Sequence, residues 1–486
     1  MNIDTNNLMQ KARYTGKMIV VGVLVIVCWV TSLFVLGLVS EREGRQVEVS
    51  NQIAEEWGRP QLVAGPVLVV PFTSLERNPI GVLENTRKNL YILPKTLEID
   101  NQISPELRKR GIFHTPVYRD VVHMSGTFIA PDLTELGITQ GSLLVKEAEL
   151  VVGLSDTRNI VAKEATWNDV AISLAPGSGP WSVNGMGIHA KLPSLSSLSS
   201  FWSATVKEQD FNLELSFTGS RGVSFLPLGD NTQITAGAPW PSPSFAGAYL
   251  PTSESLEEDN FTATWQISSL GRSYPSAWEG SVDGIKLNSG DYGNDYGGGL
   301  FAPTPTPTTR SLYVNPGSGQ NYEQALASSA FGVDLFSSVT FYTLVSRTVK
   351  YAILFIALTF LAFYLFEVIS GLRIHPFQYL LVGAGLVIFY LLLLSFSEHI
   401  GFGLSYLLSC IMTLGLITSY SASVLKARGR SWIIAGILTI LYTYLYAVLQ
   451  LENYALLFGT LFLFIALAAV MYVTRKLNWY GAEAGE

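Results

Sequence analysis

The chain has 486 residues, of which 48% are hydrophobic and only 14% are charged, and its mean hydropathy is +0.31. This apolar excess, concentrated near the two ends of the chain, is typical of an integral membrane protein and excludes an ordinary soluble one. The net charge of -7 comes without a cluster of Lys and Arg, which excludes nucleic acid as an expected partner. The two cysteines, Cys28 and Cys410, both lie in apolar runs, which excludes a C-x-x-C metal or redox site.

An N-terminal membrane anchor is predicted at residues 18–39. This uncharged run of 22 residues follows a basic segment, residues 1–17, and suffices for a helix of 1.5 Å rise per residue to cross a hydrocarbon core of about 30 Å. Because the run ends in charged residues rather than in small residues, we expect an uncleaved anchor. Residues 41–57 carry a weak helical stripe, which would either continue the anchor or pack on the next domain.

Residues 40–346 are predicted to form a β-rich domain. Apolar runs of strand length are separated there by Gly, Pro, Asn and Asp, and residues 211–217 alternate most clearly between apolar and polar side chains. No helical pattern separates the strands, which favours an antiparallel, sandwich-like arrangement over a βαβ sheet. One large sandwich and two smaller ones both stay open at this point.

Two loops stand out in this domain. The proline-rich run 239–245 cannot be a central strand, because each proline removes a backbone donor, and it is predicted to be a rigid loop. Its Trp240 and Phe245 would either cap the core, which is favoured, or face a partner. The run 288–310 is Gly-rich and then alternates Pro with Thr, which predicts a flexible loop that passes into polyproline II.

The C-terminal part, residues 347–476, is predicted to be a bundle of five transmembrane helices. The expected spans are 349–370, 376–396, 402–425, 431–449 and 454–474. Most Lys and Arg of the short loops and termini fall on one side of this topology, and that side is predicted to be cytoplasmic. Both termini, including the tail 477–486, would then be cytoplasmic, and the β domain would lie in the periplasm of a bacterium.

A family resemblance covers almost the whole chain. KYAILFIALTF, IHPFQYLLVG, FYLLLLSFSEHIGF and MYVTRKLNWY in the helical part, and LVAGPVLVVPF, RGIFHTPVY and FLPLGDNTQITAGAPWPSPSFAGAYLP in the β part, occur in an order that resembles the CreD family of bacterial inner-membrane proteins. The resemblance implies an inner-membrane protein associated with cell-envelope integrity, often linked to a two-component response, without established enzymatic activity. Asn159, where a glycine usually follows Asp-x-Arg, and Asn478, in place of an aspartate, depart from the family pattern.

Five ionisable residues near the predicted membrane ends are candidate functional residues. Glu367, Arg373 and His375 lie at the cytoplasmic end of the second span, and Glu398 and His399 lie at the outer end of the third. An imidazole beside a carboxylate can carry a proton or hold a ligand. The alternatives are a helix-end ion pair or snorkelling for Glu367, and a polar interfacial turn for Glu398 and His399.

No catalytic, cofactor or metal site is predicted. The patterns H-E-x-x-H and G-x-S-x-G are absent and the five histidines are dispersed, although His114 and His123 are expected on neighbouring strands. The sequence therefore favours a non-enzymatic scaffold or sensor in contact with the lipid bilayer, with an envelope protein, lipid or glycan as partner. The alternative is a transporter or lipid-handling protein with a polar route through the bundle.

Overall fold

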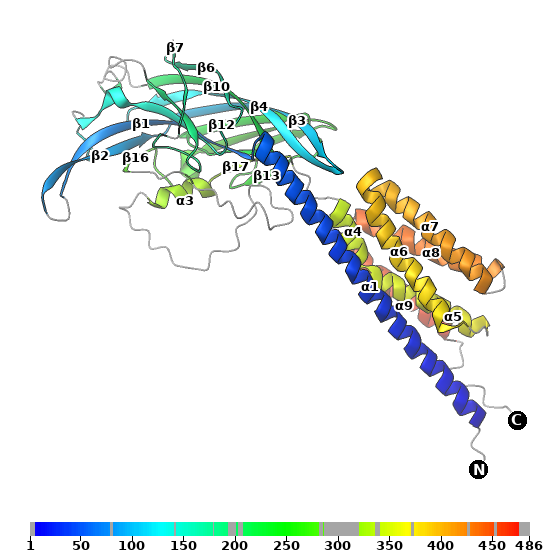
Figure 1. The fold of residues 1–486 in the computed structure, drawn as a ribbon. Helices are drawn as coiled ribbons and strands as arrows, with labels where there is room; N and C mark the ends of the chain where they lie inside the picture. The colour runs from blue at the N-terminus through cyan, green and yellow to red at the C-terminus, as the bar shows by residue number, and fades with distance from the viewer. Residues whose placement is uncertain are drawn as a thin grey trace. The chain divides into compact units, whose positions relative to one another are not determined.

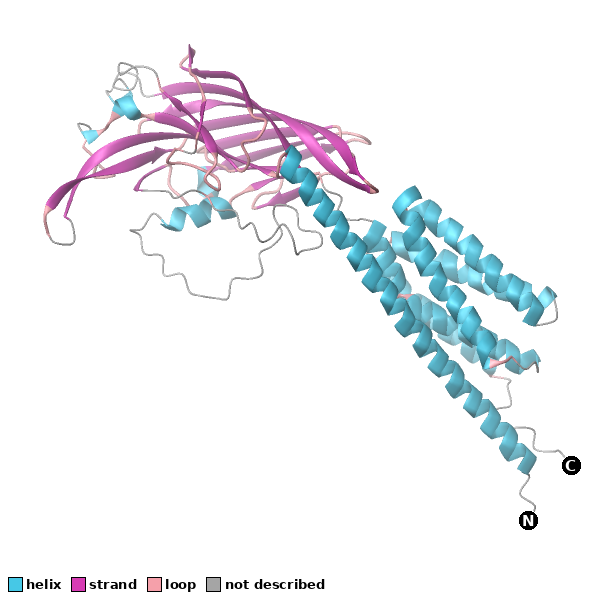
Figure 2. Cartoon of the chain, viewed as in Figure 1, coloured by secondary structure: helices cyan, strands magenta, loops and turns pink. Residues whose placement is uncertain are grey.

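The computed structural model describes residues 5–77, 81–139, 142–177, 179–192, 201–202, 208–280, 285, 320–335, 341–370, 374–424, 428–451 and 454–475. The chain forms two compact units, a helical one of Met1–Gln46 with Val339–Glu486 and a β-rich one of Val47–Ser338. The predicted class, an N-terminal apolar helix, a large mostly-β domain and a C-terminal group of apolar helices, is confirmed (Figures 1 and 2). The predicted loop 288–310, Arg373 and Asn478 lie outside the described residues.

Helix α1 (Thr5–Trp57) is one continuous helix of 53 residues. Residues 41–57 therefore continue the anchor, because no proline interrupts them, and Glu41 pairs with Arg45 at 2.7 Å in the i,i+4 position. The helix ends at Gly58, which has φ 149° and lies so close to the Thr218 carbonyl that a Cβ would be 2.6 Å from its oxygen. A side chain at this position would collide with strand backbone. Glycine has no Cβ and tolerates the positive φ, which allows the chain to leave the helix here.

The β-rich unit contains two sheets. The nine-stranded sheet has the order β13 (Ser244–Gly247), β17 (Phe331–Asp334), β11 (Gly222–Phe225), β1 (Gln61–Arg77), β5 (Glu149–Leu154), β9 (Gly187–Lys191) and β8 (Ala175–Pro176), with β2 (Leu83–Ile92) on β1 and β16 (Ala277–Gly280) on β2. The eight-stranded sheet has the order β14 (Ser253–Leu256), β15 (Phe261–Ser268), β12 (Asn231–Ala238), β3 (Thr96–Arg110), β4 (Phe113–Ile129), β10 (Glu208–Ser220), β6 (Val161–Trp167) and β7 (Val170–Ala171). Most neighbours are antiparallel, as expected, but β1–β11 and β3–β12 are parallel.

One hydrophobic cluster takes side chains from both sheets. Leu68 and Val151 come from the nine-stranded sheet, and Leu97, Phe128 and Leu213 come from the eight-stranded sheet. Within residues 211–217 of β10 the apolar positions are buried and the polar positions are half-buried, which confirms the predicted period of two. The described part of the domain is therefore one layered unit rather than two sandwiches. The described part also contains the short helices η2 (Val145–Glu147), η3 (Ser269–Gly271) and α3 (Gln320–Ser328).

The helical unit continues with α4 (Phe341–Lys350), α5 (Ala352–Ser370), α6 (Pro376–Ile400), α7 (Phe402–Val424), α8 (Arg428–Gln450) and α9 (Ala455–Thr474). Among the described residues, five helices are long and apolar enough to cross a membrane, or six if α4 and α5, which meet at a bend of 44°, form one span. Helix α4 was not predicted as an element. It buries Tyr342, Val345 and Val349 and belongs to the helical unit.

Within the helical unit, α1 buries a narrow stripe of side chains and contacts α6 at Cys28. Val21, Cys28 and Val35 are buried at a spacing of seven residues, while most other side chains of this segment are exposed. The closest approach is at Gly383 of α6, where a Cβ would overlap the Cys28 sulfur and lie 2.8 Å from the Phe360 ring. The absence of a side chain at Gly383 permits this approach, as small residues do in membrane helix pairs.

Candidate functional site

Glu367 near the end of α5 is a buried carboxylate that is surrounded by donors. Its Oε2 accepts a hydrogen bond from the Tyr379 hydroxyl at 2.8 Å, and its Oε1 accepts one from the Ile374 backbone N–H at 3.2 Å. The Lys17 ammonium of α1 forms an ion pair with Oε1 and also donates to the Ile374 carbonyl at 2.6 Å. The Glu367 side chain is 8% exposed and that of Lys17 is 20% exposed. We call this group the inner clamp, because it ties α1 to the connection between α5 and α6.

His375 begins helix α6 as its N-cap. Its Nδ1 accepts a hydrogen bond from the Phe377 backbone N–H at 3.2 Å, and its own backbone N–H donates to Gln378 Oε1 at 2.9 Å. These two bonds satisfy backbone donors that have no partner inside the helix. His375 therefore positions the start of α6 and, with it, Tyr379 of the inner clamp. Arg373 lies outside the described residues.

Glu398 near the end of α6 repeats the arrangement of the inner clamp. The Tyr342 hydroxyl of α4 donates to its Oε1 at 3.2 Å, and Arg42 Nε of α1 lies 3.8 Å from the same oxygen. The Glu398 side chain is 9% exposed, but that of Arg42 is 44% exposed. This group, the outer clamp, is thus a looser version of a cation from α1, a carboxylate and a tyrosine hydroxyl.

His399 does not join the outer clamp. Its Nδ1 lies 3.1 Å from the Ser395 carbonyl of its own helix, and its side chain is exposed. Neighbouring positions on a helix point in different directions, so Glu398 and His399 engage different partners.

The two clamps lie near opposite ends of α6. On α1, Lys17 and Arg42 are 25 positions apart (42 - 17), which corresponds to about 37 Å of helix. Between them, the buried side chains of α6 include Val382, Leu386 and Phe389. The two carboxylates are therefore separate anchors for α1 and do not share one site.

Trp240 and Phe245 both pack against the core of the β-rich unit. The Phe245 ring makes edge contacts with Phe261 and Trp265 at centroid distances of 5.9 and 5.7 Å. Trp240 is partly buried against the same cluster. The run 239–245 is not a loop throughout, because Ser244 and Phe245 begin β13. This strand lies at the edge of its sheet, where the backbone donors missing from the preceding prolines are tolerated.

The Asp-x-Arg segment binds the end of α1 to the β-rich unit. The Arg158 guanidinium lies 2.6 Å from Asp156 Oδ2, which also accepts from the Arg59 backbone N–H at 3.1 Å. Burial alone would raise the pKa of Asp156, but Arg158 and the backbone donors outweigh it and hold the pKa below its usual value. Asn159 has φ 57°, in the region that glycine and asparagine tolerate, and its amide donates to the Trp57 carbonyl at 3.3 Å, a bond that glycine could not make.

A buried carboxylate that the sequence did not indicate lies in β4. Asp120 is completely buried, and burial raises its pKa well above the usual value. The neighbouring Asn101 amide favours the ionised form, but neither side chain has a partner in good hydrogen-bonding geometry. An ionised Asp120 would therefore be costly, and the neutral form is favoured.

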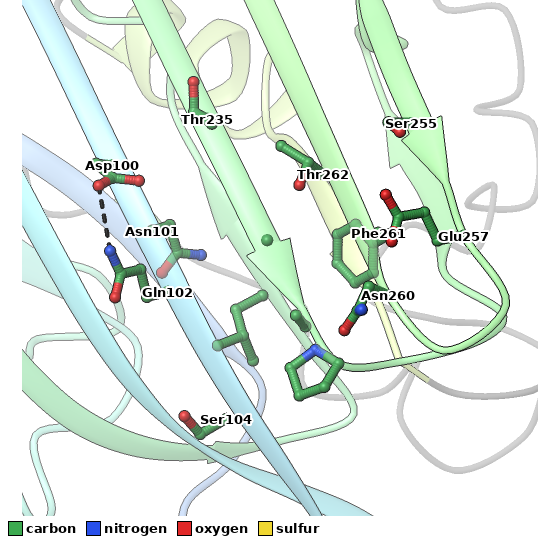
Figure 3. A pocket seen from close by; sticks show the side chains of 14 residues that line it. Asp100, Asn101, Gln102, Ser104, Thr235, Ser255, Glu257, Asn260, Phe261 and Thr262 are labelled. Atoms are coloured by element: carbon green, nitrogen blue, oxygen red, sulfur yellow. Dashed lines mark hydrogen bonds between the residues drawn. The ribbon is translucent and has the colours of Figure 1, made fainter.

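A pocket of about 550 Å³ lies on the β-rich unit where β12 ends beside β3. Asp100 and Gln102 of β3 lie on one side of it, and Glu257 and Asn260 lie on the other (Figure 3). Pro239 contributes to the lining, so the predicted rigid loop does border a recess. The sequence shows only that a strand ends at the Gly237–Pro239 segment and does not show that the neighbouring strand continues.

His114 and His123 do not meet, because both lie on β4 rather than on neighbouring strands. Nine positions of strand separate them by about 30 Å. The described residues include no group of three or more His, Cys, Asp or Glu that could hold a metal ion.

Comparison with known proteins decides the family. The family model described as "Inner membrane protein CreD" matches residues 13–480. The chain belongs to the CreD family. It is 30% identical over 460 residues to Inner membrane protein CreD of Escherichia coli (strain K12), and the match covers 94% of this chain and 91% of that relative. The resemblance seen in the sequence is thus confirmed, and this CreD-family chain is a multi-helix protein of the inner membrane.

Proposed function

We propose that this CreD-family protein is a non-catalytic scaffold or sensor of the cell envelope, whose β-rich unit binds an envelope component in the periplasm. The observation that carries the proposal is α1, a single helix that each unit holds by side chains of its own. The helical unit holds α1 at the inner and outer clamps. A change in the β-rich unit can therefore reach the membrane through continuous helix.

The β-rich unit grips the end of α1 at Trp57. The Trp57 carbonyl accepts from Thr218 Oγ1 at 2.6 Å, and its indole N–H donates to the Tyr118 carbonyl at 3.3 Å. The Arg108 guanidinium lies 4.2 Å from the indole centroid, a cation–π contact. These contacts come from β3, β4 and β10, the central strands of the eight-stranded sheet. They support a role for α1 as the element that transmits a binding event.

The distribution of basic residues supports a periplasmic β-rich unit with both termini in the cytoplasm. Lys17 bonds to the α5–α6 connection, so this connection and the basic N-terminal segment share one end of the helical unit. Arg373, Lys426, Arg428 and Arg430 lie in or beside the connections assigned to that side, whereas residues 397–401 and 450–453 contain no Lys or Arg. Positive charge marks the cytoplasmic side.

The clamps support a structural rather than a catalytic role. Glu367 accepts from three groups, and Glu398 has a tyrosine and an arginine beside it, so both carboxylates already have partners. The alternative, transport or lipid handling, requires a polar path between them. The buried α6 side chains between the clamps, such as Leu386 and Phe389, are instead mostly apolar, and Tyr390 and Ser397 are the exceptions.

Complementation of a strain that lacks its own copy tests the proposal, with sensitivity to bile salts and β-lactams as the envelope readout. Seven Gly and Ser residues inserted between Gln46 and Val47 should abolish complementation, because they break the helix. The matched control inserts seven Ala-rich helical residues, which add about two turns and restore the helical phase. This control should complement, and membrane fractionation should show equal insertion of both proteins.

Glu367→Gln separates the proposal from transport. The carboxamide oxygen keeps an acceptor but cannot carry a proton, and Lys17, which is 20% exposed, keeps its bond to the Ile374 carbonyl, so the proposal expects complementation to persist. Full complementation by the Gly/Ser insertion, or complete loss with Glu367→Gln in a stably inserted protein, would contradict the proposal.

A further inference from the structure

The pocket on the eight-stranded sheet arises from a mismatch between two parallel strands. β12 pairs with β3 from Asn231 opposite Thr96 to Gly237 opposite Gln102. β12 then ends, and Pro239, which has no N–H, cannot continue the ladder. β3 runs on to Arg110, paired there with β4 alone. A recess therefore opens beside Ile103 and Ser104, and its volume lies within the range of about 300–1,000 Å³ that is usual for small-molecule sites.

A glycine forms the hollow of this recess. Gly237 lies between Gln102 on β3 and Thr262 on β15. The middle position of this row across three strands therefore carries no side chain. A Cβ at Gly237 would meet only the Phe261 carbonyl at 3.4 Å and Thr262 Oγ1 at 3.7 Å, which are ordinary contacts. The fold thus does not require glycine here for steric reasons, and the empty space remains on the polar face of the sheet.

The lining supplies hydrogen-bond donors and acceptors together. Amides come from Gln102 and Asn260, and hydroxyls come from Thr235 and Thr262. Each of these groups can both donate and accept. Asp100 and Glu257 add acceptors on opposite sides, while none of the residues that line the pocket is Lys, Arg or His (Figure 3).

This lining selects between ligand classes. A phosphate headgroup or a peptide carboxylate would face Asp100 and Glu257 without a compensating cation, which is unfavourable. A sugar hydroxyl donates to one neighbour and accepts from another, which matches the mixture of amides, hydroxyls and carboxylates. We propose that this pocket binds a neutral, polyhydroxylated ligand, namely a carbohydrate segment of the envelope. This inference rests on the proposed binding role of the β-rich unit and names the ligand class.

Titration of the full chain with sugars tests the inference. The protein is held in lipid nanodiscs, because maltoside detergents themselves carry sugars. Maltotriose and tri-N-acetylchitotriose, which represent glucose-type and N-acetylglucosamine-type glycans, are titrated by calorimetry. We expect saturable binding of at least one trisaccharide. Gly237→Val should weaken it at least tenfold, because the side chain fills the hollow while valine suits a strand.

Gln233→Val is the matched control. It places the same side chain on the same strand and on the same face, two positions along the alternation from Thr235, and Gln233 does not line the pocket. Its sugar affinity should equal that of the unchanged protein. Binding of neither trisaccharide, or equal binding by Gly237→Val, overturns the inference. So does binding of phosphatidylglycerol vesicles or Ca²⁺ in a Gly237-dependent manner without sugar binding.

The outcome for the proposed function is read separately. If no sugar binds but Gly237→Val still abolishes complementation, the carbohydrate assignment is wrong and a binding role for the β-rich unit stands. If sugar binds but the Gly/Ser insertion in α1 leaves complementation intact, the carbohydrate assignment stands and transmission through α1 is wrong.

Discussion

The two clamps on α1 should differ greatly in strength. Lys17→Met removes the cation of the inner clamp and leaves the Glu367 carboxylate buried. Arg42→Met makes the same change at the outer clamp, where the guanidinium is 44% exposed and 3.8 Å from Glu398. We expect α1 to detach from the helical unit far more readily in Lys17→Met than in Arg42→Met.

The magnitude follows from burial. Removing one partner of a buried ion pair costs about 3–5 kcal/mol, because the remaining charge is uncompensated. Glu398 is as buried as Glu367, but its cation is 44% exposed and 3.8 Å away, so water screens this pair and its loss costs only about 0–1 kcal/mol. The difference of about 2–5 kcal/mol corresponds to roughly a 30- to 5,000-fold difference in the opening equilibrium of α1.

Cys28 provides the measurement. It is 2% exposed and lies against Gly383, so its thiol reacts only when α1 moves away from α6. In a Cys410→Ala background Cys28 is the only thiol of the chain, and its rate of alkylation by a small maleimide in nanodiscs reports opening. The matched control is Cys410 in a Cys28→Ala background, which reports α7 and should not respond to Lys17→Met. Equal labelling rates in Lys17→Met and Arg42→Met, or an equal response of Cys410, would refute the reasoning.

Three further predictions concern packing and pH. Gly383→Ala should destabilise the contact of α1 with α6 by about 1–3 kcal/mol through overlap with Cys28, measured by the same labelling, whereas Gly415→Ala, with open space at its Cβ, should have no effect. Asp120→Asn should stabilise the β-rich unit at pH 7, because burial raises the Asp120 pKa and thus disfavours the carboxylate that is ionised in the unfolded chain, measured by urea unfolding followed by tryptophan fluorescence. In the unchanged protein, the free energy of unfolding should be highest below pH about 4, where Asp120 is neutral in both the folded and the unfolded state, and should fall as pH rises through the raised pKa. Asp120→Asn should remove this dependence on pH, and an unchanged dependence would contradict the prediction. Arg158→Ala should cost about 1 kcal/mol at pH 7, and the difference from the unchanged protein should vanish as pH falls through the lowered pKa of Asp156.

The sequence predicts apolar helices of membrane length because hydrocarbon thickness fixes their length and composition, but the predicted span 349–370 runs across the 44° bend between α4 and α5. Helix α4 escapes this logic, since it has 10 residues and carries Arg347 and Lys350 in its last turn. The packed face of α1 also escapes it. Residues 18–39 carry apolar side chains on every face of the helix, so the sequence does not distinguish the buried Val21 and Val35 from the exposed Phe34. Contact with lipid and contact with another helix both favour apolar side chains, so composition cannot tell the two faces apart.

The candidate site was predicted in part. Glu367 and Glu398 are unusual because a carboxylate near a bilayer needs a partner, and that need is visible in the sequence. The identity of the partner is not visible in the sequence, because Lys17 lies 350 positions from Glu367 and belongs to another helix. Lys17 and Arg42 do flank the N-terminal anchor, so pairing the two cations with the two carboxylates would have been a testable prediction. The pocket was invisible for a similar reason, because β3 and β12 are distant in the chain and adjacent in the sheet.

The unequal clamps bear on how α1 could act in a sensor. A ligand that shifts an equilibrium between two states typically supplies about 1–3 kcal/mol of coupling. That amount exceeds the contribution of the exposed Arg42–Glu398 pair and falls below or near that of the buried Lys17–Glu367 pair. A binding event at the β-rich unit, transmitted from Trp57 along α1, would therefore release the outer clamp first and leave the inner clamp closed. In this mechanism α1 swings about the Lys17 end rather than sliding, because the Lys17–Glu367 pair persists.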